Sequence, residues 1–243
     1  MDIAEALDAT DGITCFVGAG GKKTTMATLA PRLDRAVVTA TVRIPIFDSW
    51  VEDVVVTDEP VAAVEGAESW PIGVVPERER DDRYCGYEPE TVDELADVGN
   101  PVLVKADGAR MRQFKAPSDR EPRIPSRAGT VVPIAGARAV GHPLDEERIH
   151  RVDRVSALTG REPGEEIQSA DVATVLASER GGRKGVPEGA TVVALVNMVD
   201  DAALETTARE IATEIHERAD VPRVVLAEMR AEDPLVDVVA GNH

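Results

Sequence analysis

The sequence predicts an α/β fold of three layers, in which a mostly parallel central sheet carries helices on both of its faces. Short apolar runs rich in β-branched residues alternate along the chain with segments whose apolar residues recur at helical spacing. The apolar runs are continuous, which is typical of parallel strands that are buried on both faces. A chain of 243 residues with 43% hydrophobic residues is long and apolar enough to bury such a core.

The N-terminal half begins with a strand, because residues 13–17 form an apolar run that ends at Gly18. A helix follows, since its apolar positions lie at i, i+3, i+4 and i+7 and share one face: Met26, Leu29, Ala30 and Leu33. An acidic segment after Pro89 predicts a helix over residues 90–97. Further apolar, β-branched runs predict strands at residues 36–41, 53–57, 72–75 and 101–106.

The C-terminal half continues this alternation after a long loop. Residues 108–129 are polar and contain three prolines, and residues 181–185 are rich in glycine, so both segments are predicted to be loops. Strands are expected at residues 131–135, 191–196 and 223–226, the last being the final strand of the chain. Helices are expected at residues 144–158, at residues 169–176 with Ser169 as the cap, and on the face of Leu204, Ala208, Ile211 and Ile215.

We expect the whole chain, residues 1–243, to form a single domain. The sequence contains no internal repeat, no low-complexity segment and no stretch with the composition of a linker. Residues 136–189 hold mainly helix and loop, and they are a candidate helical insertion within that domain.

The composition is strongly acidic, since 45 Asp and Glu residues against 27 Lys and Arg residues give a formal net charge of −18. Such a surface repels the phosphates of nucleic acids and anionic lipids, so we expect no nucleic-acid and no membrane partner. Only five of the basic residues are lysines, and aromatic residues make up 3% of the chain. This composition predicts a halophilic protein, because salt shortens the Debye length to about 3 Å at 1 M and weakens repulsion between carboxylates.

The N-terminus and the cysteine content favour a cytoplasmic location. Asp2, Glu5 and Asp8 follow Met1 closely, which is the wrong charge for a signal peptide. No apolar run approaches the roughly 20 residues that a membrane span requires. Two cysteines and four scattered histidines exclude a disulfide framework and a four-ligand zinc site.

The strongest functional signal is the segment FVGAGGKKTT at residues 16–25, between the first strand and the first helix. Glycines let backbone amides converge on phosphate oxygens, the helix N-terminus adds the positive end of its dipole, and a lysine adds a point charge. The alternative is a glycine-rich turn that holds no ligand. The candidate phosphate-binding residues are Gly18, Ala19, Gly20, Gly21, Lys22, Lys23, Thr24 and Thr25.

The spacing within this segment is unusual. Gly18 lies four residues before Lys22, the shorter G-x-x-G-K spacing seen in Mur-type ligases, whereas the common loop has a separation of six. Lys23 occupies the position of the usual Ser or Thr, so Thr24 becomes the candidate Mg²⁺ ligand of the loop unless metal binding is altered. Lys22 is the candidate catalytic lysine.

A second signal is the segment VLVKADG at residues 102–108. An acidic residue at the carboxyl end of a buried strand next to a phosphate loop can orient Mg²⁺, so Asp107 is the candidate metal-binding and catalytic carboxylate. The alternative is an ordinary Asp-Gly turn.

A third signal is the segment LVNMVD at residues 195–200, which resembles the N-K-x-D base-recognition element of GTPases. In that element Asp accepts hydrogen bonds from guanine and Asn braces the loop, so Asn197 and Asp200 are candidates for contact with the base of ATP or GTP. Met198 stands in place of the lysine and offers a polarizable apolar surface to a base. The alternative is that Asp200 or Asp201 caps the following helix.

Two weaker features concern the remaining edge of the site. Residues 39–43, TATVR, end the second strand where related architectures face the terminal phosphate, although β-branched residues also simply suit a strand. Lys115 lies near Arg110, Arg112 and Arg120, a basic segment that is either a grip for an anionic substrate or an ordinary solvated loop.

Taken together, these segments resemble the YqeC family, accessory proteins of selenium-dependent molybdenum hydroxylases. The likeness rests on residues 16–25, on residues 102–125 with ADG at 106–108 and KAP at 115–117, on residues 181–187 and on residues 196–200. Three residues depart from the family pattern: Lys23 replaces a hydroxyl residue, Lys105 stands where Glu is usual, and Met198 replaces Lys. The resemblance implies a P-loop NTPase-like fold and a role in handling a selenium or molybdenum cofactor.

Three functions follow as hypotheses. The first is an Mg²⁺-dependent protein that binds ATP or GTP, with hydrolysis left open, and assists a molybdenum hydroxylase or a cofactor-maturation partner. The second is an ATP-dependent ligase or kinase whose small anionic substrate is held by Arg110, Arg112 and Lys115. The third is a non-catalytic partner-binding module with a degenerate phosphate loop, which Lys23 favours. Self-association into a homodimer is left open.

Overall fold

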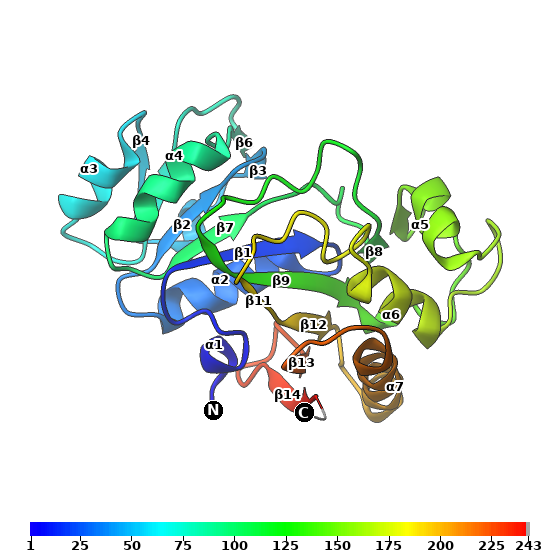
Figure 1. Ribbon diagram of the computed structural model, residues 1–243. Helices are drawn as coiled ribbons and strands as arrows, with labels where there is room; N and C mark the ends of the chain where they lie inside the picture. Colours follow the sequence, from blue (N-terminus) through cyan, green and yellow to red (C-terminus); the bar gives the residue numbers. More distant parts are fainter. Residues whose placement is uncertain (242–243) are drawn as a thin grey trace.

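A ten-stranded sheet forms the centre of the computed structural model, which describes residues 1–241 (Figure 1). In chain order the strands are β1 Ile13–Gly18, β2 Val37–Ala40, β3 Ile44–Pro45, β4 Asp53–Val56, β5 Ile72–Val75, β6 Arg83–Tyr84, β7 Val102–Lys105, β8 Phe114–Lys115, β9 Ala128–Gly136, β10 Ile149–His150, β11 Thr191–Val192, β12 Ala194–Asn197, β13 Arg223–Ala227 and β14 Leu235–Ala240. The order in the large sheet is β14-β13-β12-β9-β1-β7-β2-β5-β4, with β11 paired to β9. Its pairs are parallel except β13–β14, which confirms the mostly parallel sheet that the sequence predicts.

Helices cover both faces of this sheet. They are α1 Ile3–Ala6, α2 Lys22–Leu29, α3 Pro60–Glu65, α4 Pro89–Asp93, α5 Val152–Thr159, α6 Ser169–Ala177 and α7 Ala202–Arg218. Helices α1 and α2 pack on one face in a single hydrophobic cluster. On the other face α3 and α4 cover the half with β7, β2 and β5, while α5, α6 and α7 cover the half with β9, β12 and β13 (Figure 1). The result is the expected three-layer α/β fold, an arrangement consistent with a P-loop NTPase-like fold.

Strand β1 is the central strand of the large sheet, where it lies between β9 and β7. Its residues Ile13, Cys15, Phe16 and Val17 are at most 2% exposed, which explains why the strand is apolar on both faces. The parallel register places Phe16 opposite Lys105 of β7, so the segments that follow the two strands emerge at the same edge. That edge brings together the loop before α2 and the segment after β7.

Some predicted elements need correction. The chain continues past residues 223–226 into β14, an antiparallel edge strand that the sequence analysis missed, because its alternating exposure and Asp237 weaken the apolar run. The helix predicted at residues 144–158 begins only at Val152, after turns and the short strand β10; Arg151, with a left-handed backbone, caps it. The helix α6 has Gln168 rather than Ser169 at its N-cap.

The segment predicted as one strand at residues 191–196 is divided into β11 and β12, which both pair with β9. The loop predicted at residues 108–129 also contains structure, because β8 within it pairs with β10 and β9 begins at Ala128. Residues 136–189 hold α5, α6 and β10.

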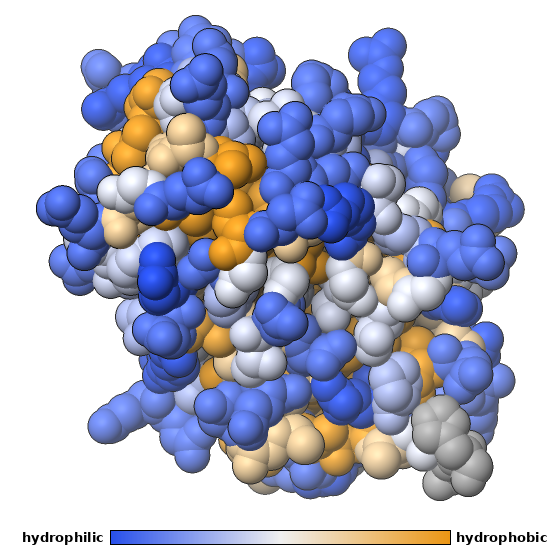
Figure 2. All heavy atoms as spheres, turned by 60° about the vertical axis from the view of Figure 1, so that its left-hand side comes forward, coloured by the Kyte–Doolittle hydropathy of each residue, from blue (hydrophilic) through white to orange (hydrophobic). Residues whose placement is uncertain are grey.

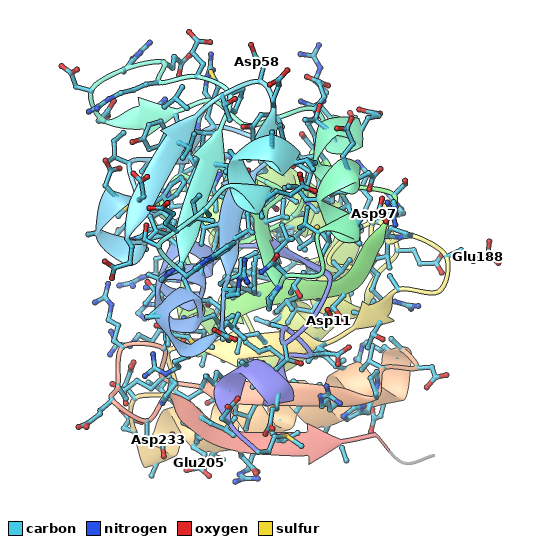
Figure 3. All side chains as sticks on the ribbon, turned by 90° about the vertical axis from the view of Figure 1, so that its left-hand side faces the viewer. Asp11, Asp58, Asp97, Glu188, Glu205 and Asp233 are labelled. Atoms are coloured by element: carbon cyan, nitrogen blue, oxygen red, sulfur yellow. The ribbon has the colours of Figure 1, made fainter. Side chains whose placement is uncertain are left out.

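Acidic side chains are distributed over the whole surface. Figure 3 shows six of them on different parts of the chain, projecting from the ribbon: Asp11, Asp58, Asp97, Glu188, Glu205 and Asp233. Figure 2 shows a mostly hydrophilic face with apolar areas between the polar side chains. Val56 of the edge strand β4 is 50% exposed. Within residues 1–241, none of the helices combines the length and the apolar character needed to cross a membrane.

We expect the folded state to require salt. With a net charge of −18, lowering the salt from about 1 M to about 0.01 M extends the Debye length from about 3 Å to about 30 Å and exposes the carboxylates to one another. The melting temperature, measured by circular dichroism, is expected to fall by roughly 5 °C or more, equivalent to about 1–2 kcal/mol for a chain of this size. Equal melting temperatures at the two salt concentrations would contradict the halophilic prediction.

Candidate functional site

The loop between β1 and α2 is built from glycines that the backbone requires. Gly18, Gly20 and Gly21 have positive φ angles of 88°, 87° and 133°. A Cβ at Gly18 or Gly20 would collide with the backbone of Ile134 or Gly136 in β9, and one at Gly21 would collide with the side chain of Asn197. The glycines therefore let the loop lie directly against the end of β9, which fixes where α2 begins.

The amides of this loop fall into two groups. Those of Gly18, Ala19 and Gly20 donate to Oδ2 of Asp107 and to the carbonyls of Ile134 and Arg112, at 2.8, 2.9 and 2.9 Å. The four that follow have no hydrogen-bond acceptor within the described part of the protein: Gly21, Lys22, Lys23 and Thr24. The unpaired donors are thus those of the first turn of α2, where a helix attracts anions.

Lys22 does not project into solvent but lies between the loop and the strand β7. Its ammonium donates to the Gly18 carbonyl and lies 2.9 Å from Oδ1 of Asp107, and the two side chains are 4% and 1% exposed. Lys115 contacts the other carboxylate oxygen of Asp107 at 2.8 Å and is itself buried. The carboxylate is therefore held between two ammonium groups.

A second carboxylate extends this network. Glu121 lies 3.3 Å from the Lys115 ammonium and 2.7 Å from the Arg151 guanidinium, and it accepts from the amide of Gly108. Lys184 supports the same turn, because its ammonium donates to the carbonyls of Ser118 and Glu121 at 2.6 and 2.9 Å. Lys115 was predicted as part of a solvated basic patch or a substrate grip; the structure places it instead inside the protein as a partner of Asp107.

Burial and charge act against each other in this cluster. Burial opposes ionisation of Asp107, but the Lys22 and Lys115 ammoniums outweigh it and hold the pKa of the carboxyl below its usual range. For Glu121, likewise, burial is outweighed by Lys115 and Arg151, and the pKa is lowered. Burial lowers the pKa of Lys22, and the nearby Asp107 only partly offsets this.

Basic side chains outnumber acidic ones here. Four basic residues lie close to two carboxylates, in a chain whose net charge is −18: Lys22, Lys105, Lys115 and Arg151 with Asp107 and Glu121. The two other lysines of the chain are neighbours of the cluster, since Lys184 supports Glu121 and Lys23 follows Lys22. Because basic groups exceed acidic ones in this cluster, an anion that approaches it would not meet a net negative charge.

The residues present are compatible with Mg²⁺. Oδ1 of Asp107 is buried and pairs with the Lys22 ammonium at 2.9 Å without a hydrogen bond of good geometry, so this oxygen could act as a ligand of a hard cation or its water once Lys22 moves away. Thr24 lies in the first turn of α2, partly exposed. Residues 1–241 contain no cluster of three or more His, Cys, Asp or Glu side chains arranged for a metal. Phosphate oxygens and water would therefore complete the coordination.

The base-recognition candidates have separate positions. Asn197 is buried behind the loop, where Nδ2 donates to the Gly20 carbonyl at 2.8 Å and Oδ1 accepts from the Met229 amide at 3.1 Å. It therefore braces the loop. Asp200 is 25% exposed and forms an ion pair with Arg138 at 2.5 Å. The cap of α7 is Asp201, whose carboxylate accepts from the Leu204 amide.

On the side of the loop away from β9, the threonine hydroxyls at the end of β2 form hydrogen bonds within the fold. Thr39 donates to the Val74 carbonyl at 2.8 Å and Thr41 donates to the Arg123 carbonyl at 2.5 Å. The polar group that does lie at this edge is the ammonium of Lys105, which the sequence marks only as a departure from the family pattern. Burial, together with the Lys22 charge, lowers the pKa of Lys105 to about 7. The scarcity of lysine was the signal that could have singled it out.

The segment after Asp107 lies over the loop. The Arg112 carbonyl accepts from the Gly20 amide, and the Gln113 carbonyl accepts from the Gly136 amide, both at 2.9 Å. Arg110 and Met111 have left-handed backbone conformations, with φ angles of 47° and 63°, and Met111 is 83% exposed. Strained residues of this kind concentrate at functional sites.

Comparison with known proteins supports one family. The family described as "YqeC protein" matches residues 14–153, more than half of the chain. The Escherichia coli strain K12 protein named "Uncharacterized protein YqeC" is 29% identical over 196 residues, which cover 76% of this chain and 75% of that protein. The matched family region includes the glycine loop, Asp107, Lys115 and Glu121, and it ends before Asn197.

Proposed function

This chain belongs to the YqeC protein family, and we propose that it binds a nucleoside triphosphate with Mg²⁺ at the N-terminus of α2 and so assists maturation of a molybdenum hydroxylase. The single observation that carries the binding proposal is the set of four unpaired amides at the start of α2, next to Lys22. The link to a selenium or molybdenum cofactor rests on the resemblance of the sequence to that family.

The loop supports phosphate binding through its direction and its rigidity. The glycines press it against β9, and Asn197 holds it from behind, so the amides from Gly21 to Thr24 are fixed before any ligand arrives. Preorganised donors at a helix N-terminus bind phosphate well because no conformational entropy remains to be lost. Lys22 can leave the Gly18 carbonyl and add its charge to a phosphate.

Mg²⁺ would be held by Asp107 and Thr24, and when bound it would neutralise the charge of the phosphates. Asp107 lies at the end of β7, next to β1, the position from which a carboxylate reaches a metal beside a phosphate loop. Lys115 keeps that carboxylate ionised when Lys22 moves away. Asn197 braces the loop, and Asp200 lies two residues after Met198 on the side expected to face the base.

A specific observation favours a second candidate, an ATP-dependent ligase or kinase. An open cavity of about 430 Å³ lies beside residues 116–117, and its lining includes Arg154, Arg180 and Lys184 together with the acidic residues Asp119 and Glu179. Arg154 is paired with Asp119, so a small anionic substrate would be held there by the exposed Arg180. In this version of the site Lys115 is not the substrate grip, because it is occupied by Asp107 and Glu121.

Isothermal titration with ATP and with GTP, with and without Mg²⁺ and in concentrated salt, tests the proposal. Micromolar binding that Mg²⁺ strengthens is expected, and the two titrations identify the base preference. The absence of binding to either nucleotide would contradict the proposal and favour a partner-binding module. Hydrolysis assays then distinguish the two candidate activities. Hydrolysis of the nucleotide without a second substrate supports an NTPase, whereas hydrolysis that requires an added small acid or cofactor fragment supports the ligase or kinase.

Replacing Lys22 by Ala is expected to weaken triphosphate binding at least tenfold, about 1.4 kcal/mol, because the variant lacks the ammonium that lies against the glycine loop at the Gly18 carbonyl. The protein should stay folded, since Lys115 still pairs with Asp107. Titration of the variant with ATP measures the loss. Lys23→Ala is the matched control, and a larger loss in that variant than in Lys22→Ala would shift the register of the loop by one residue.

A further inference from the structure

Lys105 occupies the carboxyl end of β7 at the point where three strands meet. The parallel register pairs it with Phe16 of β1 and with Ala40 of β2. Because side chains alternate along a strand, Lys105 shares a face with Leu103, which belongs to the same hydrophobic cluster as Met26 of α2. Its side chain therefore starts on the face of the sheet that carries α2, two residues before Asp107.

The ammonium of Lys105 is buried without a countercharge in contact. The residue is 6% exposed, and the one hydrogen bond of its ammonium within residues 1–241 is to the Arg43 carbonyl, at 2.6 Å. It forms no ion pair with a described carboxylate. An ammonium has three donors, so two of them are unused. A buried cation in this condition is costly to fold, and an anionic ligand would satisfy it.

The orientation of a bound nucleotide follows from the two sides of the loop. Asn197, Met198 and Asp200 follow β12, on the β9 side of β1, and they are the candidates for the base. Phosphates bound at the start of α2 would then extend away from β12, toward the ends of β7 and β2. At that end the hydroxyls of Thr39 and Thr41 already donate hydrogen bonds to backbone carbonyls. The ammonium of Lys105 still has N–H groups without an acceptor among the described residues.

We propose that Lys105 binds the terminal phosphoryl group and makes the site prefer a nucleoside triphosphate over the diphosphate. The inference rests on the proposed function, because it assumes that a nucleotide occupies the loop. It assigns different roles to two lysines: Lys22, in the loop, contacts phosphates common to both nucleotides, and Lys105 contacts the phosphate that only the triphosphate has. The contact with the Arg43 carbonyl is then the resting position of a side chain with a long, flexible stem.

The test is titration of the full chain with ATP and with ADP, in the parent protein and in Lys105→Met. The parent is expected to bind ATP at least tenfold more tightly than ADP. Lys105→Met should reduce that ratio to about threefold or less while ADP affinity stays within about twofold, since the lost contact is to the terminal phosphate. Lys105→Arg, which keeps the charge, should retain more of the ratio than the Met variant.

Arg127→Met is the control, because it removes one cation that pairs with Asp97 on the surface, outside the site, and should leave the ratio unchanged. Melting curves establish that each variant is folded. An unchanged ratio in Lys105→Met, or a parallel loss of ATP and ADP affinity, would overturn the assignment and leave Lys105 as a support for the Arg43 carbonyl. Equal parental affinity for ATP and ADP overturns this inference alone, whereas a parent that binds neither nucleotide overturns the proposed function as well.

Discussion

Replacing Asp107 by Asn is expected to lower the free energy of unfolding by about 3 kcal/mol at neutral pH, because it leaves two buried ammonium groups without their shared partner. The Asp107 carboxylate is 1% exposed and lies 2.9 and 2.8 Å from the ammoniums of Lys22 and Lys115. Its pKa is held below the ordinary range, so the stabilisation is present above the unfolded pKa of about 4 and is lost as pH falls below it.

Urea unfolding followed by circular dichroism, without nucleotide or Mg²⁺, measures this loss. Asp97→Asn is the control, because Asp97 also pairs with a cation, Arg127, but on the surface, where solvent screens the interaction. Asp107→Asn should be clearly less stable than Asp97→Asn. Equal stability of the two variants would show that the buried cluster adds nothing to the fold.

The central part of the fold was predictable from the sequence because its signals are local. Continuous apolar runs mark the buried parallel strands, and the helical spacing that begins at Met26 marks the buried face of α2. The predicted helix extended too far, because α2 ends at Leu29, Ala30 lies in a 3-10 turn and Leu33 follows that turn in an extended conformation. The glycines between β1 and α2 follow from the same local geometry. The glycine loop and Asp107 could therefore be placed at one edge of the sheet, where the structure also has them.

The partners of Asp107 were not predictable in the same way. Lys115 and Glu121 lie in a polar, proline-rich segment with no periodicity, and only the folding of that segment over the loop brings them to the carboxylate. The sequence suggested a solvated patch, because a lysine between arginines has no local feature that marks burial. The edge strand β14 was missed for a related reason: its pairing with β13 is antiparallel and its outer side is half exposed.

The roles of the site residues also depend on contacts that only the structure supplies. Asn197 was predicted to contact a base, and in the structure its Nδ2 donates to the Gly20 carbonyl, so that it braces the glycine loop. Lys105 was noticed as a departure from the family pattern, but its burial depends on the packing of α2 against β7. Residues of this kind are recognised by how deeply they are buried and by which hydrogen-bonding groups they contact or leave unsatisfied. Neither property can be derived from the spacing of residues along the chain.

Replacing Lys105 by Met is expected to raise the free energy of unfolding by about 2 kcal/mol at about pH 6, because an apolar side chain of similar length does not bring a charge into the interior. The pKa of Lys105 is lowered from 10.5 to about 7 in the folded protein. Between these values the unfolded chain binds a proton that the folded chain lacks, so stability of the parent rises with pH. Below about pH 7 both states are charged and the cost of burial is complete.

The gain in Lys105→Met should therefore be largest at about pH 6 and shrink toward about pH 10, where the folded parent is neutral at this position and the unfolded parent is beginning to lose its proton. Urea unfolding at both pH values measures the difference, with Lys184→Met as the control that loses two hydrogen bonds and gains no stability. A Lys105→Met variant that is less stable than the parent at pH 6 would show that the ammonium is fully satisfied inside the protein. A more stable variant that has lost its preference for triphosphate would identify Lys105 as a residue whose charge destabilises the empty site and is neutralised by the ligand.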